Sequence, residues 1–143
     1  MPVDFQIDRE NQFVTVTMHG VVVLQEILDY FDALVVEDAM RYPKLIDTRQ
    51  AQPQLSDDDV MVLGARVSAY AAYDPRGPIA TVVTSRQTTE FLRRFMNLGG
   101  AERPMQIFTT MEEARAWLRA AMQVEVKRGS SASTDPGADG SDR

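Results

Sequence analysis

The sequence predicts an α/β protein with a five-stranded mixed, mostly parallel sheet and about four helices, in the order ββαβαβαβα. Three observations support this class. Short apolar runs alternate with amphipathic stretches of roughly a dozen residues between residues 13 and 122. Helix-start signals stand at the junctions, as where Ser56 precedes Asp59 by three residues. Residues 79–83 are almost wholly apolar and β-branched, which is typical of a strand covered on both faces.

The chain is expected to open on a β-hairpin followed by a helix. Apolar and polar side chains alternate along residues 4–8 and 13–18, and Gly20 is expected to end the second strand. From Leu24 to Val35, apolar side chains recur with the spacing of one helix face. This helix should therefore lay its apolar stripe on the sheet.

Three strand–helix pairs are expected to complete the sheet. The predicted strands are residues 44–48, 79–83 and 104–108, with a loop containing Pro53 after the first of them. The predicted helix caps are Ser56 with Asp59, Thr84 with Gln87, and Thr109 with Glu112. Parallel strands place their carboxyl ends on one edge of a sheet, so a site is expected there.

Composition and charge limit the classes of function. A chain of 143 residues with 44% hydrophobic residues suits one globular domain, which we expect over residues 1–125. From Lys127 onward no apolar residue is larger than Ala, so residues 126–143 are expected to form a disordered tail. The net charge of −6 speaks against nucleic acid as a partner.

Several kinds of chemistry are excluded or disfavoured. Cysteine is absent and His19 is the single histidine, so one chain cannot build a disulfide or a multi-histidine metal site. Neither G-x-G-x-x-G nor a Walker sequence occurs, and no cofactor is expected. The N-terminus lacks the features of a secretion signal, and the longest apolar run is far too short for a transmembrane segment. We expect a cytoplasmic protein.

The order of elements resembles that of the STAS domain family (sulfate transporter and anti-sigma antagonist). The resemblance rests on the strand 44–47 that ends in Asp47, the helix that opens at Ser56, the strand 78–83, and the segments 107–108 and 112–118. The more similar branch is the SpoIIAA-like bacterial one, whose mostly uncharacterised small proteins also resemble a lipid-binding fold. The resemblance covers roughly residues 3–122, and it implies binding and regulation rather than catalysis.

The resemblance also implies a phosphorylation site. In anti-sigma antagonists, a partner kinase phosphorylates a Ser at the start of the helix after the third strand, and Ser56 occupies that place here. The surroundings differ, because Leu55 replaces an Asp and Asp57 replaces the next Ser. A phosphate on Ser56 would gain from the helix N-terminus but would lie close to the acidic residues 57–59. The alternative is that Ser56 is a plain helix cap.

Polar side chains at the predicted strand ends form a candidate ligand-binding rim. Its members are His19, Asp47, Thr48, Arg49, Thr84, Ser85, Arg86, Thr109 and Thr110. Backbone N–H groups at two helix N-termini, together with Arg86, suit a small anionic or amphipathic ligand. The alternative is that the hydroxyls simply cap helices. Ser85, His19 and Asp47 have the residue types of a catalytic triad, although no G-x-S-x-G motif surrounds Ser85.

Aromatic and sulfur side chains offer a second kind of site. Six of them either line an apolar pocket or belong to the core: Tyr30, Tyr70, Tyr73, Phe91, Phe95 and Met96. The predicted helix that carries Phe91 and Phe95 is also basic, because it contains Arg86, Arg93 and Arg94. One interpretation is a contact surface for an acidic partner. The plainer one is that the arginines are solvated and lie opposite a stripe that faces the core.

The interpretation we favour at this point is a non-enzymatic binding or regulatory module. It would act through protein–protein interaction with a partner protein or with a second copy of itself, as a homodimer formed through a helix or an edge strand. One alternative is a carrier or sensor of a lipid-like or small anionic ligand. Another is a hydrolase that uses Ser85 and His19.

Overall fold

A computed structural model describes residues 2–73, 76–97 and 104–134. The strands are β1 (Val3–Asp8), β2 (Phe13–Val23), β3 (Lys44–Gln54), β4 (Ile79–Val82) and β5 (Met105–Phe108). The helices are α1 (Leu24–Val36), α2 (Asp57–Ala69), α3 (Arg86–Phe95) and α4 (Met111–Thr134), with a short 3₁₀ helix, η1 (Tyr70–Tyr73), after α2. The predicted order of strands and α-helices is confirmed.

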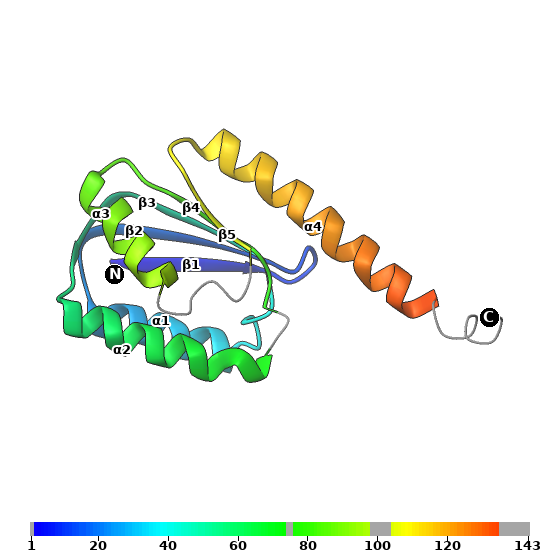
Figure 1. Ribbon diagram of the computed structural model, residues 1–143, viewed down its shortest axis with the longest axis horizontal. Helices are drawn as coiled ribbons and strands as arrows, with labels where there is room; N and C mark the ends of the chain where they lie inside the picture. The colour runs from blue at the N-terminus through cyan, green and yellow to red at the C-terminus, as the bar shows by residue number, and fades with distance from the viewer. Residues whose placement is uncertain (1, 74–75, 98–103, 135–143) are drawn as a thin grey trace.

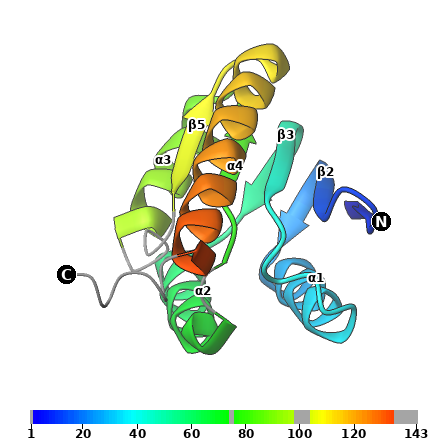
Figure 2. The same cartoon turned by 90° about the vertical axis from the view of Figure 1, so that its right-hand side faces the viewer.

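One sheet carries all five strands, in the order β1-β2-β3-β4-β5. β1 pairs antiparallel with β2, and the other three pairings are parallel, as predicted. The helices lie on both faces of the sheet. Figures 1 and 2 show α1 and α2 on one face and α4 across the opposite face, while α3 packs beside α2.

Each face of the sheet has its own cluster of buried side chains. On the α1 and α2 side, Val14 and Val16 of β2 pack with Leu34 and Leu63, and all four are almost fully buried. On the α4 side, Leu45 and Val82 meet Ala114 and Leu118. The alternating pattern of the strands and the apolar stripes of the helices therefore meet as the sequence predicts.

The two central strands are longer than predicted. β2 does not end at Gly20, which has a φ of +70° and pairs with Ala51, but continues to Val23. Likewise, the segment around Pro53 is not a loop, because it pairs with the end of β2 as part of β3. Its polar composition and its proline disfavour a strand, but pairing with the valine-rich end of β2 overrides that local preference.

β3 contains a bulge that changes which of its side chains face the helices. Thr17 pairs with Asp47 and His19 pairs with Gln50, so one residue of β2 lies opposite two of β3. Ahead of the bulge, the even-numbered positions of β3 face α1 and α2. After it, the odd-numbered Ala51 and Pro53 face that side. The bulge thus keeps apolar side chains on one face along the whole strand.

Two helix caps lie one residue later than predicted. Ser85, not Thr84, caps α3 by accepting a hydrogen bond of 3.1 Å from the Thr88 N–H. Thr110, not Thr109, accepts from the Glu113 N–H at the start of α4. In both places two hydroxyl residues are adjacent, and the cap falls to the second. The predicted capping box of Ser56 and Asp59 is confirmed, with both hydrogen bonds at 3.0 Å.

The last helix continues beyond the expected end of the domain. α4 runs to Thr134 and so includes residues 126–134, which the composition assigned to a disordered tail. Adding residues to an existing helix is easier than starting one, which favours continuation into a segment of weak helix formers. Residues 135–143 of the expected tail lie outside the described residues. No helix in the described part of the chain has the length and apolar character needed to span a membrane.

Candidate functional site

Side chains of the predicted polar rim are largely engaged with one another or with nearby main chain. The Arg49 guanidinium donates two hydrogen bonds of 2.9 Å to the two carboxylate oxygens of Asp47. The main-chain N–H of Arg49 donates a third, to Asp47 Oδ1. These bonds lower the pKa of Asp47 below its ordinary value, against a smaller opposing effect of burial, and Asp47 in turn raises the pKa of Arg49. The pair is a closed unit rather than an open anion site.

The hydroxyls of the rim are also largely engaged. Thr48 Oγ1 donates to the Val82 carbonyl at 2.8 Å, and Thr84 Oγ1 donates to the Arg49 carbonyl at 3.1 Å. Ser85 and Thr110 cap helices, as described above. Arg86 lies 3.5 Å from Glu90 in an exposed ion pair one helical turn away. Thr109 is exposed. Most of these groups therefore stabilise strands and helix starts, and His19 and residues 47–49 lie within β2 and β3 because both strands are longer than predicted.

The residues of the proposed triad are not brought together. His19 Nε2 lies 3.0 Å from Asp4 Oδ2 across the β1–β2 hairpin. Ser85 Oγ donates to Thr88 Oγ1 at 2.9 Å. Among the described residues, no hydrogen bond joins His19 to Ser85 or to Asp47. A nucleophile and its base must lie within hydrogen-bonding distance, so this geometry does not support the hydrolase alternative.

Ser56 is exposed at the N-terminus of α2, where its hydroxyl belongs to the capping box. The neighbouring Asp57 forms an ion pair with Arg94 of α3. These contacts establish the cap that the sequence predicts, and phosphorylation of Ser56 stays a prediction from the resemblance.

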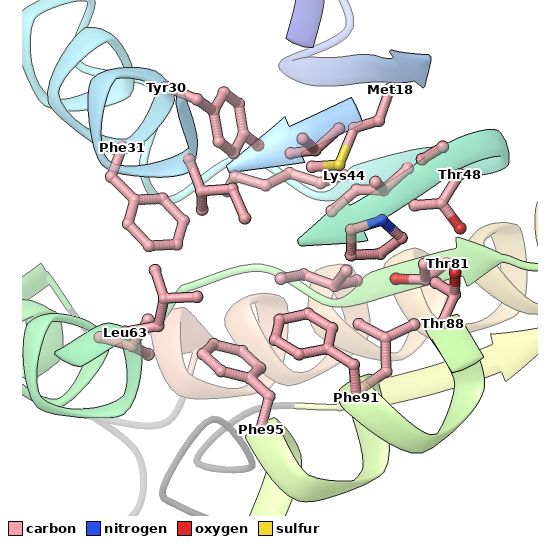
Figure 3. Close-up of a pocket in the computed structure, with 18 of the residues that line it drawn as sticks. Met18, Tyr30, Phe31, Lys44, Thr48, Leu63, Thr81, Thr88, Phe91 and Phe95 are labelled. Atoms are coloured by element: carbon pink, nitrogen blue, oxygen red, sulfur yellow. The ribbon is translucent and has the colours of Figure 1, made fainter. Parts of the chain in front are cut away.

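A cavity of about 100 Å³ lies between the sheet and helices α1, α2 and α3 (Figure 3). Its wall is almost entirely apolar. Among the described residues, the apolar lining consists of Met18, Val22, Ile27, Tyr30, Phe31, Leu34, Met40, Ile46, Ala51, Pro53, Leu55, Leu63, Val67, Ile79, Phe91, Leu92, Phe95 and Met105. The cavity therefore runs along the helix-covered face of the sheet and not along its polar rim.

Aromatic side chains form much of the helical side of this cavity. Tyr30 and Phe31 come from α1, and their ring centroids lie 5.7 Å apart. Phe91 and Phe95 come from α3 and are stacked at 6.3 Å. Figure 3 shows all four rings directed into the space between α1, α3 and the sheet. Phe91 and Phe95 lie one turn apart on α3 and therefore point the same way, whereas Tyr30 and Phe31 are consecutive on α1 and both still line the cavity.

The aromatic prediction is confirmed in part. Tyr30, Phe91 and Phe95 line the cavity, as the sequence suggested. Tyr70 and Tyr73 pack instead against the core, and Tyr70 makes an edge-on contact with Phe31 at 5.8 Å. Met96 is likewise absent from the described lining.

Four polar side chains also belong to the lining, and just one of them, Thr48, is among the residues of the predicted rim. The others are Lys44, Thr81 and Thr88, and all four are at most 6% exposed. The Lys44 ammonium donates to the carbonyls of Met40 and Tyr42 at 2.8 and 2.7 Å. Two of these four side chains could have been noticed in the sequence, because Lys44 and Thr81 are polar residues within otherwise apolar predicted strands.

A second, more polar pocket adjoins the cavity. It measures about 140 Å³ and shares Pro53, Leu55 and Phe91 with the apolar cavity. The rest of its described lining is Gln87, Glu90 and Arg94 of α3. The shared side chains are half-buried, so this is the side on which the apolar cavity approaches solvent.

Comparison with solved structures settles the fold. An uncharacterised protein of the DUF3478 family from Shewanella loihica PV-4, described as having a SpoIIAA-like fold, superposes with a TM-score of 0.53 at 14% sequence identity. The match covers 81% of this chain and 91% of that one. The chain has a SpoIIAA-like fold. The predicted fold class is thereby confirmed. No protein-family model and no curated protein matches the sequence.

Proposed function

We propose that this protein is a non-enzymatic binding module whose site is the apolar cavity between the sheet and helices α1 to α3. Its ligand is a small apolar or lipid-like molecule. The observation that carries the proposal is the cavity wall, in which four aromatic rings and many aliphatic side chains surround about 100 Å³ of space. Apolar walls with a few polar groups are typical of small-molecule sites.

The volume limits the size of the ligand. An engineered apolar cavity of about 150 Å³ stays dry and binds benzene, so about 100 Å³ suits one small ring or a short alkyl chain. A longer chain would extend past Pro53 and Phe91 into the adjoining polar pocket. A lipid-like ligand would then bury part of its chain and leave its polar end near solvent.

The polar rim supports an anionic ligand less well. Asp47 neutralises Arg49, and Glu90 lies beside Arg86. Binding an anion there would require breaking one of these pairs. The apolar cavity needs no such rearrangement, which is why we place the ligand site there.

Toluene and phenol are suitable probes because each is a single ring of matching size. Titration of the ¹⁵N-labelled protein should shift amide signals of residues that line the cavity. Ala51→Leu adds volume at the wall and should weaken binding of both probes. Ala116→Leu makes the same change on the exposed side of α4, and there the affinity should stay as in the wild type. A wild-type protein that binds neither probe up to its solubility limit would contradict the proposal.

A second candidate function is self-association through α2, which would meet the expectation of a protein partner. Met61 is 59% exposed and Val62 is 44% exposed on the outer side of this helix, next to the exposed Ala65. α2 is acidic at its start, at Asp58, and basic near its end, at Arg66. Two antiparallel copies of α2 would therefore place opposite charges beside each other around an apolar centre, with Arg66 exchanging or sharing its exposed ion pair with Asp32.

Sedimentation velocity tests this second candidate. The wild-type protein should sediment as a dimer, and Met61→Lys should convert it to a monomer. Val36→Lys places the same charge on a side chain that is 81% exposed at the end of α1, and it should leave the dimer intact. A wild-type protein that stays monomeric at high concentration would rule out the α2 interface.

A further inference from the structure

Three buried threonines lie together at one end of the apolar cavity (Figure 3). Thr48 comes from β3, Thr81 from β4 and Thr88 from α3, and their exposed fractions are 6%, 4% and 3%. Thr81 pairs with Ile46 on the neighbouring strand, so Thr48 is its diagonal neighbour on the same face. Three hydroxyls therefore lie within a wall that is otherwise apolar.

The three hydroxyls differ in what they bind. The Thr48 hydroxyl donates a hydrogen bond to the Val82 carbonyl, and the Thr88 hydroxyl accepts one from Ser85 Oγ. Thr81 Oγ1 makes no hydrogen bond to any other residue in the part of the chain that the structure describes. Its donor hydrogen and its lone pairs are therefore both available on the cavity side. Because Thr81 lines the cavity, a polar group that enters the cavity can form the hydrogen bond that the described protein groups do not supply.

From this arrangement we infer that the ligand carries one uncharged hydrogen-bonding group, a hydroxyl or a carbonyl, that binds Thr81 at the threonine end of the cavity. The inference rests on the proposed function and names the class of ligand. The ligand is then not a plain hydrocarbon but a small apolar molecule with one buried polar atom. Thr48 and Thr88 keep that atom in place, because their hydroxyls still have acceptor or donor capacity left over from the bonds they make.

The charge in the wall explains why the group is neutral. Lys44 is the charged side chain of the described lining, and its ammonium binds the carbonyls of Met40 and Tyr42. Lys44 pairs with Ile79, so Thr81 lies two residues further along the neighbouring strand, and the two carbonyls already take up the Lys44 ammonium. A carboxylate at Thr81 would be desolvated among apolar side chains and would have to draw that ammonium away from its two carbonyls, whereas a hydroxyl or carbonyl loses far less hydration.

Phenol and toluene test the inference because they have nearly the same shape and differ by one hydroxyl. The affinities of both probes are measured by calorimetry for the wild type, for Thr81→Val and for Thr17→Val. Thr81→Val keeps the shape of the side chain and removes its hydroxyl. It should weaken phenol binding by about three- to tenfold and leave toluene binding unchanged. Thr17→Val makes the same change at an exposed position on β2 and should alter neither affinity.

An unchanged ratio of phenol to toluene affinity in Thr81→Val would overturn the inference while the proposed function stands. The same unchanged ratio is expected if Thr81 binds an ordered water in the cavity and not the ligand. Binding of neither probe to the wild type would instead contradict the proposed function itself. If Thr81→Val does not fold, Thr81→Ser and Thr81→Ala provide a second pair that differs by the hydroxyl alone. The serine variant should bind phenol more tightly than the alanine variant, and equal affinities would overturn the inference.

Discussion

Thr48 Oγ1 donates a hydrogen bond of 2.8 Å to the main-chain carbonyl of Val82, and this contact ties the bulge of β3 to the last residue of β4. The bulge is the point at which β3 changes the side chains that it turns toward the helices. The hydrogen bond between the two strands therefore lies at the bulge, which keeps apolar side chains of β3 directed into the cavity.

Replacing Thr48 by Val should destabilise the protein. The variant keeps the side-chain shape but removes the donor to the Val82 carbonyl, in a place that is 6% exposed. Loss of such a bond costs about 1 kcal/mol in the free energy of unfolding, measured by urea denaturation. Thr17→Val serves as the control on the exposed side of β2 and should stay within about 0.5 kcal/mol of the wild type. Equal losses in the two variants would show that the Thr48 bond does not stabilise the fold.

The bulge and the long end of β3 could not be predicted from local sequence. Residues 49–54 contain three glutamines, an arginine and Pro53, a composition typical of a loop. In the fold, β4 pairs with β3 along residues 44–47, so the end of β3 has β2 as its strand neighbour. Pro53 is tolerated there because a strand edge does not require its missing N–H. Residues 49–54 form a strand because they pair with the distant end of β2, and the local sequence does not contain that information.

The Asp47–Arg49 pair should make stability depend on pH. Arg49 lowers the pKa of Asp47 in the folded protein below 3.8, so the pair stabilises the fold above that pH. This contribution is lost as the pH falls through the lower, folded-state pKa. Arg49→Gln should therefore reduce the free energy of unfolding at pH 7, and its difference from the wild type should shrink as the pH falls below about 4.

Urea denaturation of both proteins from pH 7 to pH 2 measures this difference. Arg86→Gln is the matched control, because Arg86 is 90% exposed and its ion pair with Glu90 spans 3.5 Å. Exposed pairs of this kind contribute little, so the control should follow the wild type at every pH. A difference for Arg49→Gln that is constant with pH would mean that Asp47 titrates alike in the two proteins.

The helix caps give a third prediction, at the start of α4. Thr110 accepts from the Glu113 N–H at 3.2 Å, whereas Thr109 is the preceding, exposed residue. Thr110→Ala should lower the free energy of unfolding by about 1 kcal/mol, and Thr109→Ala should leave it nearly unchanged. Thermal unfolding followed by circular dichroism compares the two variants. A larger loss for Thr109→Ala would place the cap where the sequence alone suggested.

The sequence predicted the elements and their order better than their ends. Hydrophobic periodicity located the helices and strands, because burial of an apolar stripe is repeated over many residues. A cap depends on one residue, and Thr109 with Glu112 fits the motif as well as Thr110 with Glu113 does. Where the spacing of two candidates is the same, the packing of the helix on the sheet selects one of them.

The candidate site was the least predictable part. The rim was chosen from the predicted strand ends, but β2 and β3 continue past it, and its hydrogen bonds depend on side-chain geometry, as in the pairing of Asp47 with Arg49. The apolar cavity arises where aromatic side chains from α1 and α3 leave space that neither Phe31 nor Phe91 fills. A sequence pattern marks such residues as buried, but it does not distinguish a filled core from one with a cavity.

Gly77 should not tolerate a side chain. An added Cβ would lie 2.6 Å from the Pro43 nitrogen and 2.8 Å from the Arg41 carbonyl oxygen, both of which are backbone atoms. The Gly77 N–H donates to that carbonyl, and the Lys44 N–H donates to the Pro78 carbonyl, so the contact sets how β3 and β4 begin side by side. Because backbone cannot move aside as a flexible side chain can, Gly77→Ala should cost roughly 1–3 kcal/mol in the free energy of unfolding, measured by urea denaturation.

Gly20→Ala is the control, because its Cβ would lie in open space and its φ of +70° is the sole source of strain. The Gly77 variant should therefore lose some stability through displacement of β3 against β4, visible as shifted amide signals in both strands, whereas the Gly20 variant should shift signals near Gly20 alone. Shifts confined to residue 77 and its chain neighbours would show that the approach of the two segments is not a constraint on the sheet.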